Sequence, residues 1–113
     1  MKQTIQRKPL LSAMIGNRNV SSVDVREIQF EPGQQTGRHL HPCAVFGYIA
    51  AGVAVYQIEG QPARQLQAGS AFYEPAETVI ARFDNASDSD PMTFVAFYLL
   101  DGEQELITML ETK

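Results

Sequence analysis

The segment GQQTGRHLHPCAVFGYIAAG, residues 33–52, decides the fold of this 113-residue chain. It begins at a strong turn signal, Pro32-Gly33. Residues 44–51 are almost all apolar, so both faces of a strand at this place must be covered. Gly52 marks a turn, and the apolar residues 53–58 that follow complete a hairpin. This segment therefore predicts paired β-strands.

Short apolar runs continue along the chain, separated by turn residues at the spacing of a sandwich or barrel. No long helical pattern is present. Val23 and Val25 share one strand parity, whereas Ile28 and Phe30 share the other. We therefore expect a β-bulge or a bend between these two pairs, near residues 26–27.

The length of 113 residues has room for one domain, which we assign to residues 1–113. Its barrel core is expected at about residues 20–101, with an N-terminal arm and a C-terminal tail on either side. The apolar residues of the tail, between positions 106 and 110, fit either a short helix or a final strand.

The charge pattern excludes several classes of partner. Thirteen acidic and nine basic residues give a net charge of −4, and the basic residues are scattered, so a nucleic-acid partner is not expected. No run approaches the roughly 20 apolar residues of a membrane helix, and residues 10–15 are too short for a signal-peptide core. Cys43 is the single cysteine and has no partner for an intrachain disulfide. We expect a cytoplasmic protein with no membrane partner.

His39 and His41 are the residues of this sequence best suited to a chemical role. Residues two apart on a strand point to the same side, so the two imidazoles converge. Imidazole suits divalent transition metals such as zinc, iron and nickel. Two histidines at this spacing also occur by chance, and metal sites generally supply three or four protein ligands. The pair alone therefore predicts weak metal binding.

The surroundings of this pair resemble the cupin superfamily. Four residues stand at the intervals of the first cupin motif: Gly33, His39, His41 and Gly52. Gly69 and Pro75 match the second motif, and the resemblance spans about residues 26–100. It implies an all-β fold, the double-stranded β-helix or RmlC-like jelly-roll barrel, which commonly forms dimers. Cupins of this kind include dioxygenases, isomerases, decarboxylases and lyases.

The chain departs from the cupin motifs at metal-binding positions. In metal-binding cupins a glutamate of the first motif and a histidine of the second complete the ligand set, and Val45 and Ile80 stand at those places. Glu77 replaces the second glycine of the second motif. The resemblance therefore implies one divalent transition metal, Zn, Fe, Ni or Mn, that is weakly bound or absent. We expect a ligand pocket lined by Val45, Glu74, Ile80 and Arg82.

Three other residues can supply the missing metal ligands. Cys43 shares the strand parity of the histidines, and as a thiolate it is the candidate third ligand. Glu74 precedes Pro75 and can reach the pocket, and Asp84 shares the parity of Ile80. The commoner roles are structural: a cysteine as a small buried hydrophobe, and carboxylates as solvated or hydrogen-bonded strand ends.

Arg82 lies on the pocket face if Ile80 does, because the two residues share strand parity. There it can pair with a carboxylate or phosphate of the ligand, and otherwise it is a surface arginine.

Three functions remain open. The first is a metal-dependent enzyme of the oxygenase, isomerase or lyase type that uses His39 and His41 and acts on a small molecule in the barrel. The second is a metal-free module that binds or senses a small ligand. The third is metal-free acid–base catalysis, which needs a carboxylate beside a histidine. In each case, the doubly apolar strands at residues 44–51 and 93–100 lead us to expect a homodimer.

Overall fold

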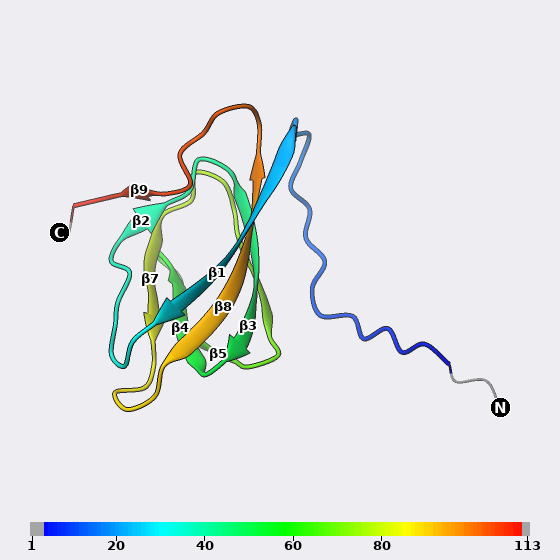
Figure 1. Ribbon diagram of the computed structural model, residues 1–113. Coiled ribbons are helices and arrows are strands. Elements are labelled where there is room, and N and C mark those ends of the chain that lie inside the picture. The colour runs from blue at the N-terminus through cyan, green and yellow to red at the C-terminus, as the bar shows by residue number, and fades with distance from the viewer. Residues whose placement is uncertain (1–3, 112–113) are drawn as a thin grey trace.

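Two antiparallel sheets pack face to face in the computed structural model, which describes residues 4–111 (Figure 1). The strands in this range are β1 Ser22–Phe30, β2 His39–Leu40, β3 Ala44–Ala51, β4 Val53–Ile58, β5 Arg64–Gln67, β6 Ala71–Glu74, β7 Ile80–Asn85, β8 Met92–Leu100 and β9 Thr108–Met109. One sheet has the order β1-β8-β3-β6, and the other has the order β5-β4-β7-β2-β9. Residues 4–111 contain no helix, which confirms the all-β prediction.

The core lies between the sheets and is rich in aromatic rings. Phe72, Phe83 and Phe94 form a chain of contacts with ring centroids 4.9 Å apart at each step. Phe72 reaches the core from β6 by lying over Gly47, its partner on β3. A Cβ atom at Gly47 would lie only 2.0 Å from the ring of Phe72. Glycine is therefore required at this position by close packing.

β1 runs without interruption, contrary to the bulge expected near residues 26–27. It pairs with β8 in one register from Ser22 opposite Leu100 to Phe30 opposite Met92. Val23 and Val25 are 54% and 55% exposed, because they lie on the outer face of the sheet. The prediction was wrong since it assumed that every apolar residue of the strand faces the core.

β7 contains a bulge that the sequence did not reveal. Its pairing with β4 shifts from Arg82 opposite Gln57 to Ile80 opposite Ile58, which leaves Ala81 as the extra residue. Ile80 and Phe83 consequently point into the core, whereas Arg82 is exposed. The bulge breaks the shared parity that was expected to put Arg82 beside Ile80.

The two ends of the described chain differ. The C-terminal tail forms β9, which pairs with β2, so the tail is a strand rather than a helix. Residues 4–21 form no strand, and Figure 1 shows this arm as an extended segment outside the barrel. Within residues 4–111 there is no helix long and apolar enough to cross a membrane.

Replacing Gly47 with alanine should lower the free energy of unfolding by about 1–3 kcal/mol, because the new methyl group collides with the buried ring of Phe72. Urea denaturation measures the change. The cost should shrink when Gly47→Ala is made in a Phe72→Leu background, since the ring is then gone. An equal cost in both backgrounds would contradict the steric explanation.

Candidate metal centre

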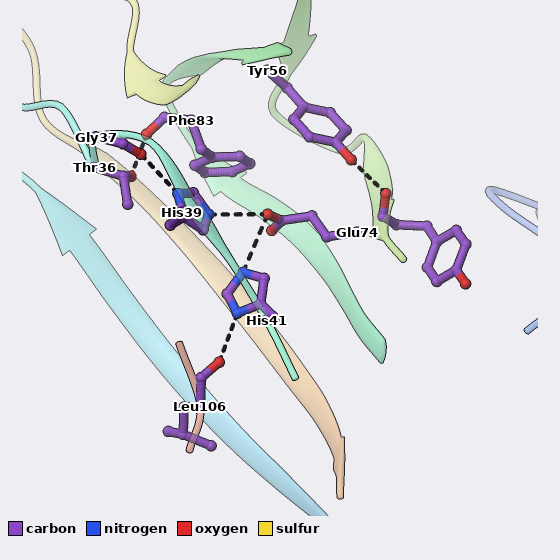
Figure 2. Close-up of polar contacts among 9 residues, drawn as sticks. Thr36, Gly37, His39, His41, Tyr56, Glu74, Phe83 and Leu106 are labelled. Carbon is purple, nitrogen blue, oxygen red and sulfur yellow. Dashed lines mark hydrogen bonds and ion pairs between the residues drawn. The ribbon is translucent and has the colours of Figure 1, made fainter. Parts of the chain in front are cut away.

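Three side chains from both sheets converge between the layers (Figure 2). His39 lies on β2, and His41 follows in the connection to β3. Glu74 is the last residue of β6, at the point where Pro75 ends the strand. All three are buried, with exposed fractions of 2%, 5% and 4%. Burial of two imidazoles and a carboxylate at one point requires that they interact with one another or with a bound group.

The distances in this triad suit a metal ion. The Nε2 atom of His39 lies 3.3 Å from Oε1 of Glu74, and Nε2 of His41 lies 3.2 Å from the same oxygen. The three candidate ligand atoms all lie within 4.8 Å of one another. Ligands about 2.1 Å from a metal are separated by about 3.0–3.4 Å at octahedral or tetrahedral angles. Both separations between histidine and glutamate fall in that range, whereas the 4.8 Å spread of the whole set exceeds it, so a bound ion would draw the side chains closer together.

The other nitrogen of each ring fixes its tautomer. Nδ1 of His39 lies 2.8 Å from the carbonyl oxygen of Gly37, and Nδ1 of His41 lies 2.6 Å from that of Leu106. A carbonyl oxygen only accepts, so each Nδ1 must carry the donated proton. In the neutral rings both Nε2 lone pairs then face the carboxylate of Glu74. Metal-binding histidines typically donate their other N–H in this way.

The charges in the triad support one another. Burial raises the pKa of Glu74, but the hydrogen bonds and charges of His39 and His41 outweigh this effect and bring the pKa below its usual range. Burial lowers the pKa of His41, but Glu74 and the Leu106 carbonyl outweigh it and leave the pKa raised. Glu74 is therefore an ionised carboxylate, as a metal ligand must be.

Glu74 stands directly across from Val45. These two residues are register partners on β6 and β3, so their side chains lie on the same face of the sheet. Val45 occupies the place where the first cupin motif carries its glutamate. The chain thus provides a carboxylate to the same region from the neighbouring strand. Glu74, rather than Cys43, is the third candidate ligand.

The remaining predicted site residues lie elsewhere. Cys43 is fully buried in the hydrophobic core, and burial raises the pKa of its thiol, which disfavours the thiolate needed for metal binding. Ile80 is opposite His39 and packs in the core, outside the cavity lining. Arg82 is exposed and forms an ion pair of 2.9 Å with the buried carboxylate of Asp84, away from the pocket. The structure thus places Val45 and Glu74 in the pocket wall, but neither Ile80 nor Arg82.

A cavity of about 230 Å³ adjoins the triad. Its twelve lining residues include all three candidate ligands, His39, His41 and Glu74. Seven others are apolar: Ile28, Phe30, Val45, Phe83, Phe94, Ala96 and Ile107. Thr36 and Tyr98 complete the wall. A metal held by the triad would therefore face a small, mainly apolar space inside the barrel.

The segment from within β1 to within β8 matches a known protein family. The model of the cupin domain family matches residues 26–98. The chain belongs to the cupin domain family. The matched segment holds every member of the triad, and the jelly-roll prediction is confirmed. None of the curated proteins matches the sequence.

Solved structures show the same fold. The DMSP lyase DddQ from Ruegeria pomeroyi DSS-3 superposes with a TM-score of 0.67 at 22% identity, over 78% of this cupin and 43% of that chain. A cupin-like protein from Thermotoga maritima MSB8 superposes with a TM-score of 0.67 at 25% identity, over 78% of this cupin and 64% of that chain. Oxalate oxidase in complex with glycolate superposes with a TM-score of 0.63 at 21% identity, over 78% of this cupin and 46% of that chain. This cupin spans 43% to 64% of the length of these proteins, and the likeness establishes the fold.

The metal-free protein should be most stable near pH 5–6. Stability from the lowered pKa of Glu74 is lost as the pH falls below the ordinary value of 4.5, and stability from the raised pKa of His41 is lost as the pH rises above 6.5. Glu74→Gln should flatten this profile and lower the free energy of unfolding at pH 6 by about 1–3 kcal/mol. Denaturant titrations across pH with EDTA present measure both effects. The exposed Glu105→Gln variant is the matched control, and an equal response from it would refute the assignment.

Proposed function

We propose that this cupin is a metal-dependent enzyme that binds one divalent transition metal through His39, His41 and Glu74 and acts on a small molecule in the adjoining cavity. The convergence of the two Nε2 atoms on one carboxylate oxygen carries the proposal. Two histidines and one carboxylate with open positions are typical of non-haem iron(II) oxygenases, and zinc, nickel and manganese accept similar ligands. When bound, such a metal polarises a substrate oxygen or activates dioxygen or water.

The protein residues then have separate roles. The carbonyl oxygens of Gly37 and Leu106 hold the two rings in orientation through their Nδ1 protons. The apolar cavity wall excludes water and strengthens electrostatic interactions at the centre. The three candidate ligands line the cavity, so a substrate in it would lie beside the centre.

Metal-free acid–base catalysis is the alternative with some support, because Glu74 lies beside His41. A general base must present a free nitrogen to its substrate. Here Nδ1 of His41 bonds Leu106 and Nε2 faces Glu74, so both nitrogens are engaged. This arrangement favours the metal over the acid–base reaction. A metal-free binding or sensing module is the other alternative, and metal content separates it from the proposed enzyme.

Tag-free protein should contain about one equivalent of a transition metal by elemental analysis, and chelation should lower its melting temperature because the metal binds the folded state. His41→Ala and Glu74→Ala should each reduce the content below roughly a tenth of an equivalent, since only two ligands remain. Cys43→Ala should retain the metal, because the thiol lies outside the triad. Metal-free wild type with a melting temperature unaffected by EDTA or by added Zn²⁺, Fe²⁺, Ni²⁺ or Mn²⁺ would exclude the proposed centre.

The register of β3 and β6 permits a sharper form of this experiment. Glu74→Val removes the carboxylate, and adding Val45→Glu returns it from the neighbouring strand to the same face. We expect the single variant to lose the metal and the double variant to regain it. Recovery would show that the carboxylate, and not the fold around residue 74, determines binding.

We also propose that the chain forms a homodimer through the outer face of the β1-β8-β3-β6 sheet. Tyr48 and Phe97 are exposed there, and with Leu10 and Leu11 of the N-terminal arm they line an apolar groove. The arm exposes further apolar side chains, including Met14. A second copy fits this surface because one chain supplies both an apolar arm and an apolar face, which makes the surface self-complementary.

Sedimentation velocity at micromolar concentration should give the mass of a dimer. Phe97→Glu should shift the protein to monomer, because a charge on the interface is costly to bury. Met109→Glu, which changes an exposed apolar residue on β9 of the other sheet, should leave the dimer intact. A monomeric wild type would refute this proposal.

A further inference from the structure

The size of the cavity limits what the candidate centre can accept. An apolar cavity of about 150 Å³ is sufficient for benzene. The cavity here has about 230 Å³, which accommodates one aromatic ring or an aliphatic group of similar size with a small polar head group. A disaccharide or a nucleotide is far too large for this space.

The charge of the cavity wall limits the ligand further. None of the residues that line it within the described chain is a lysine or an arginine. Arg82 lies outside, and both its charge and that of Arg26 are matched by aspartates, Asp84 and Asp24. A phosphate or a second carboxylate in the cavity would therefore be buried without a cation, which is strongly unfavourable. A divalent metal and one glutamate leave a charge of about +1, which a single anionic group neutralises.

Hydrogen-bonding groups on the wall are also few. The hydroxyl group of Thr36 donates to the carbonyl oxygen of Phe83, so its proton is committed. Within residues 4–111, the phenol group of Tyr98 makes no hydrogen bond. Every fully buried polar side-chain atom in this range has a hydrogen-bond partner, so the phenol oxygen of Tyr98 must be accessible. The ring of Tyr98 lies 5.9 Å from that of His41. Tyr98 is thus the available donor beside the candidate centre, whereas the many hydroxyl groups of a sugar would find few partners.

We propose that the substrate is a neutral or monoanionic molecule about the size of one ring, largely apolar, whose single polar head group binds at the metal and accepts a hydrogen bond from Tyr98. This inference rests on the proposed metal centre. It makes Tyr98 a positioning residue, and it excludes sugar phosphates and dianions as substrates. The apolar remainder of the substrate packs against the phenylalanines that line the cavity, Phe30, Phe83 and Phe94.

Two ligands that differ by one carboxylate test the proposal. The protein loaded with Zn²⁺ is titrated by calorimetry with benzoate and with isophthalate, which share one ring and differ in charge. Benzoate should bind at least tenfold more tightly than isophthalate or glucose 6-phosphate. Equal or tighter binding of isophthalate or glucose 6-phosphate would overturn the inferred substrate class.

Variants of tyrosine test the positioning role. Tyr98→Phe should weaken benzoate binding by roughly ten- to 100-fold, as expected for the loss of one hydrogen bond to a charged group. It should leave toluene binding unchanged, because toluene has no head group. Tyr48→Phe, at an exposed tyrosine outside this cavity, is the matched control. Unchanged benzoate affinity in Tyr98→Phe would remove Tyr98 from the proposal.

Toluene binding to the metal-free protein separates the cavity from the metal. Chemical-shift changes confined to the cavity residues should appear whether or not metal is present, because the apolar wall needs no metal. Toluene binding together with failure to take up metal would refute the proposed centre and leave the one-ring cavity standing. Absence of toluene binding in both forms would refute the inferred substrate class, even with the metal in place.

Discussion

The carboxylate of Glu74, shared between the Nε2 atoms of His39 and His41, is the interaction on which this end of the barrel depends. It links the two sheets, because β2 belongs to one and β6 to the other. Three buried polar groups in an apolar core are tolerated only when each has a partner. Each ring also bonds a backbone carbonyl, so no nitrogen of the pair is left without one. The polar centre and the apolar core around it are therefore compatible.

The backbone around the triad is arranged to keep these contacts. After Pro75 the chain turns back, and Glu77 adopts a left-handed conformation with φ of 60°. Such a conformation costs a residue with a side chain about 1–2 kcal/mol. In return, the Glu77 N–H donates to the carbonyl oxygen of His41 at 2.7 Å. The turn after β6 is thereby attached to the backbone that carries one of the histidines, and Glu74 is held against its partner.

Local sequence was sufficient for the fold and for the histidine pair but not for the complete site. The spacing of His39 and His41 on a strand, and the glycines around them, can be read directly along the chain. The role of Glu74 follows from the pairing of β3 with β6, which joins residues 29 positions apart. Arg82 was misplaced because a bulge at Ala81 reverses the strand parity, and no turn residue marks that bulge. Cys43 shares the strand parity of the histidines, but its side chain packs in the hydrophobic core, and strand parity alone does not predict that packing.

The position of the carboxylate also has a consequence for specificity. A glutamate on β3 at position 45 would make that part of the cavity wall polar, whereas valine there keeps it apolar. Isoleucine at position 80 similarly fills core space beside His39 without adding a ligand. With a carboxylate at the strand end on β6, the chain keeps three candidate metal ligands, and its cavity wall is less polar than a wall with the complete set of motif ligands. The departures from the cupin motifs therefore leave three candidate ligands in place while they make the cavity wall less polar.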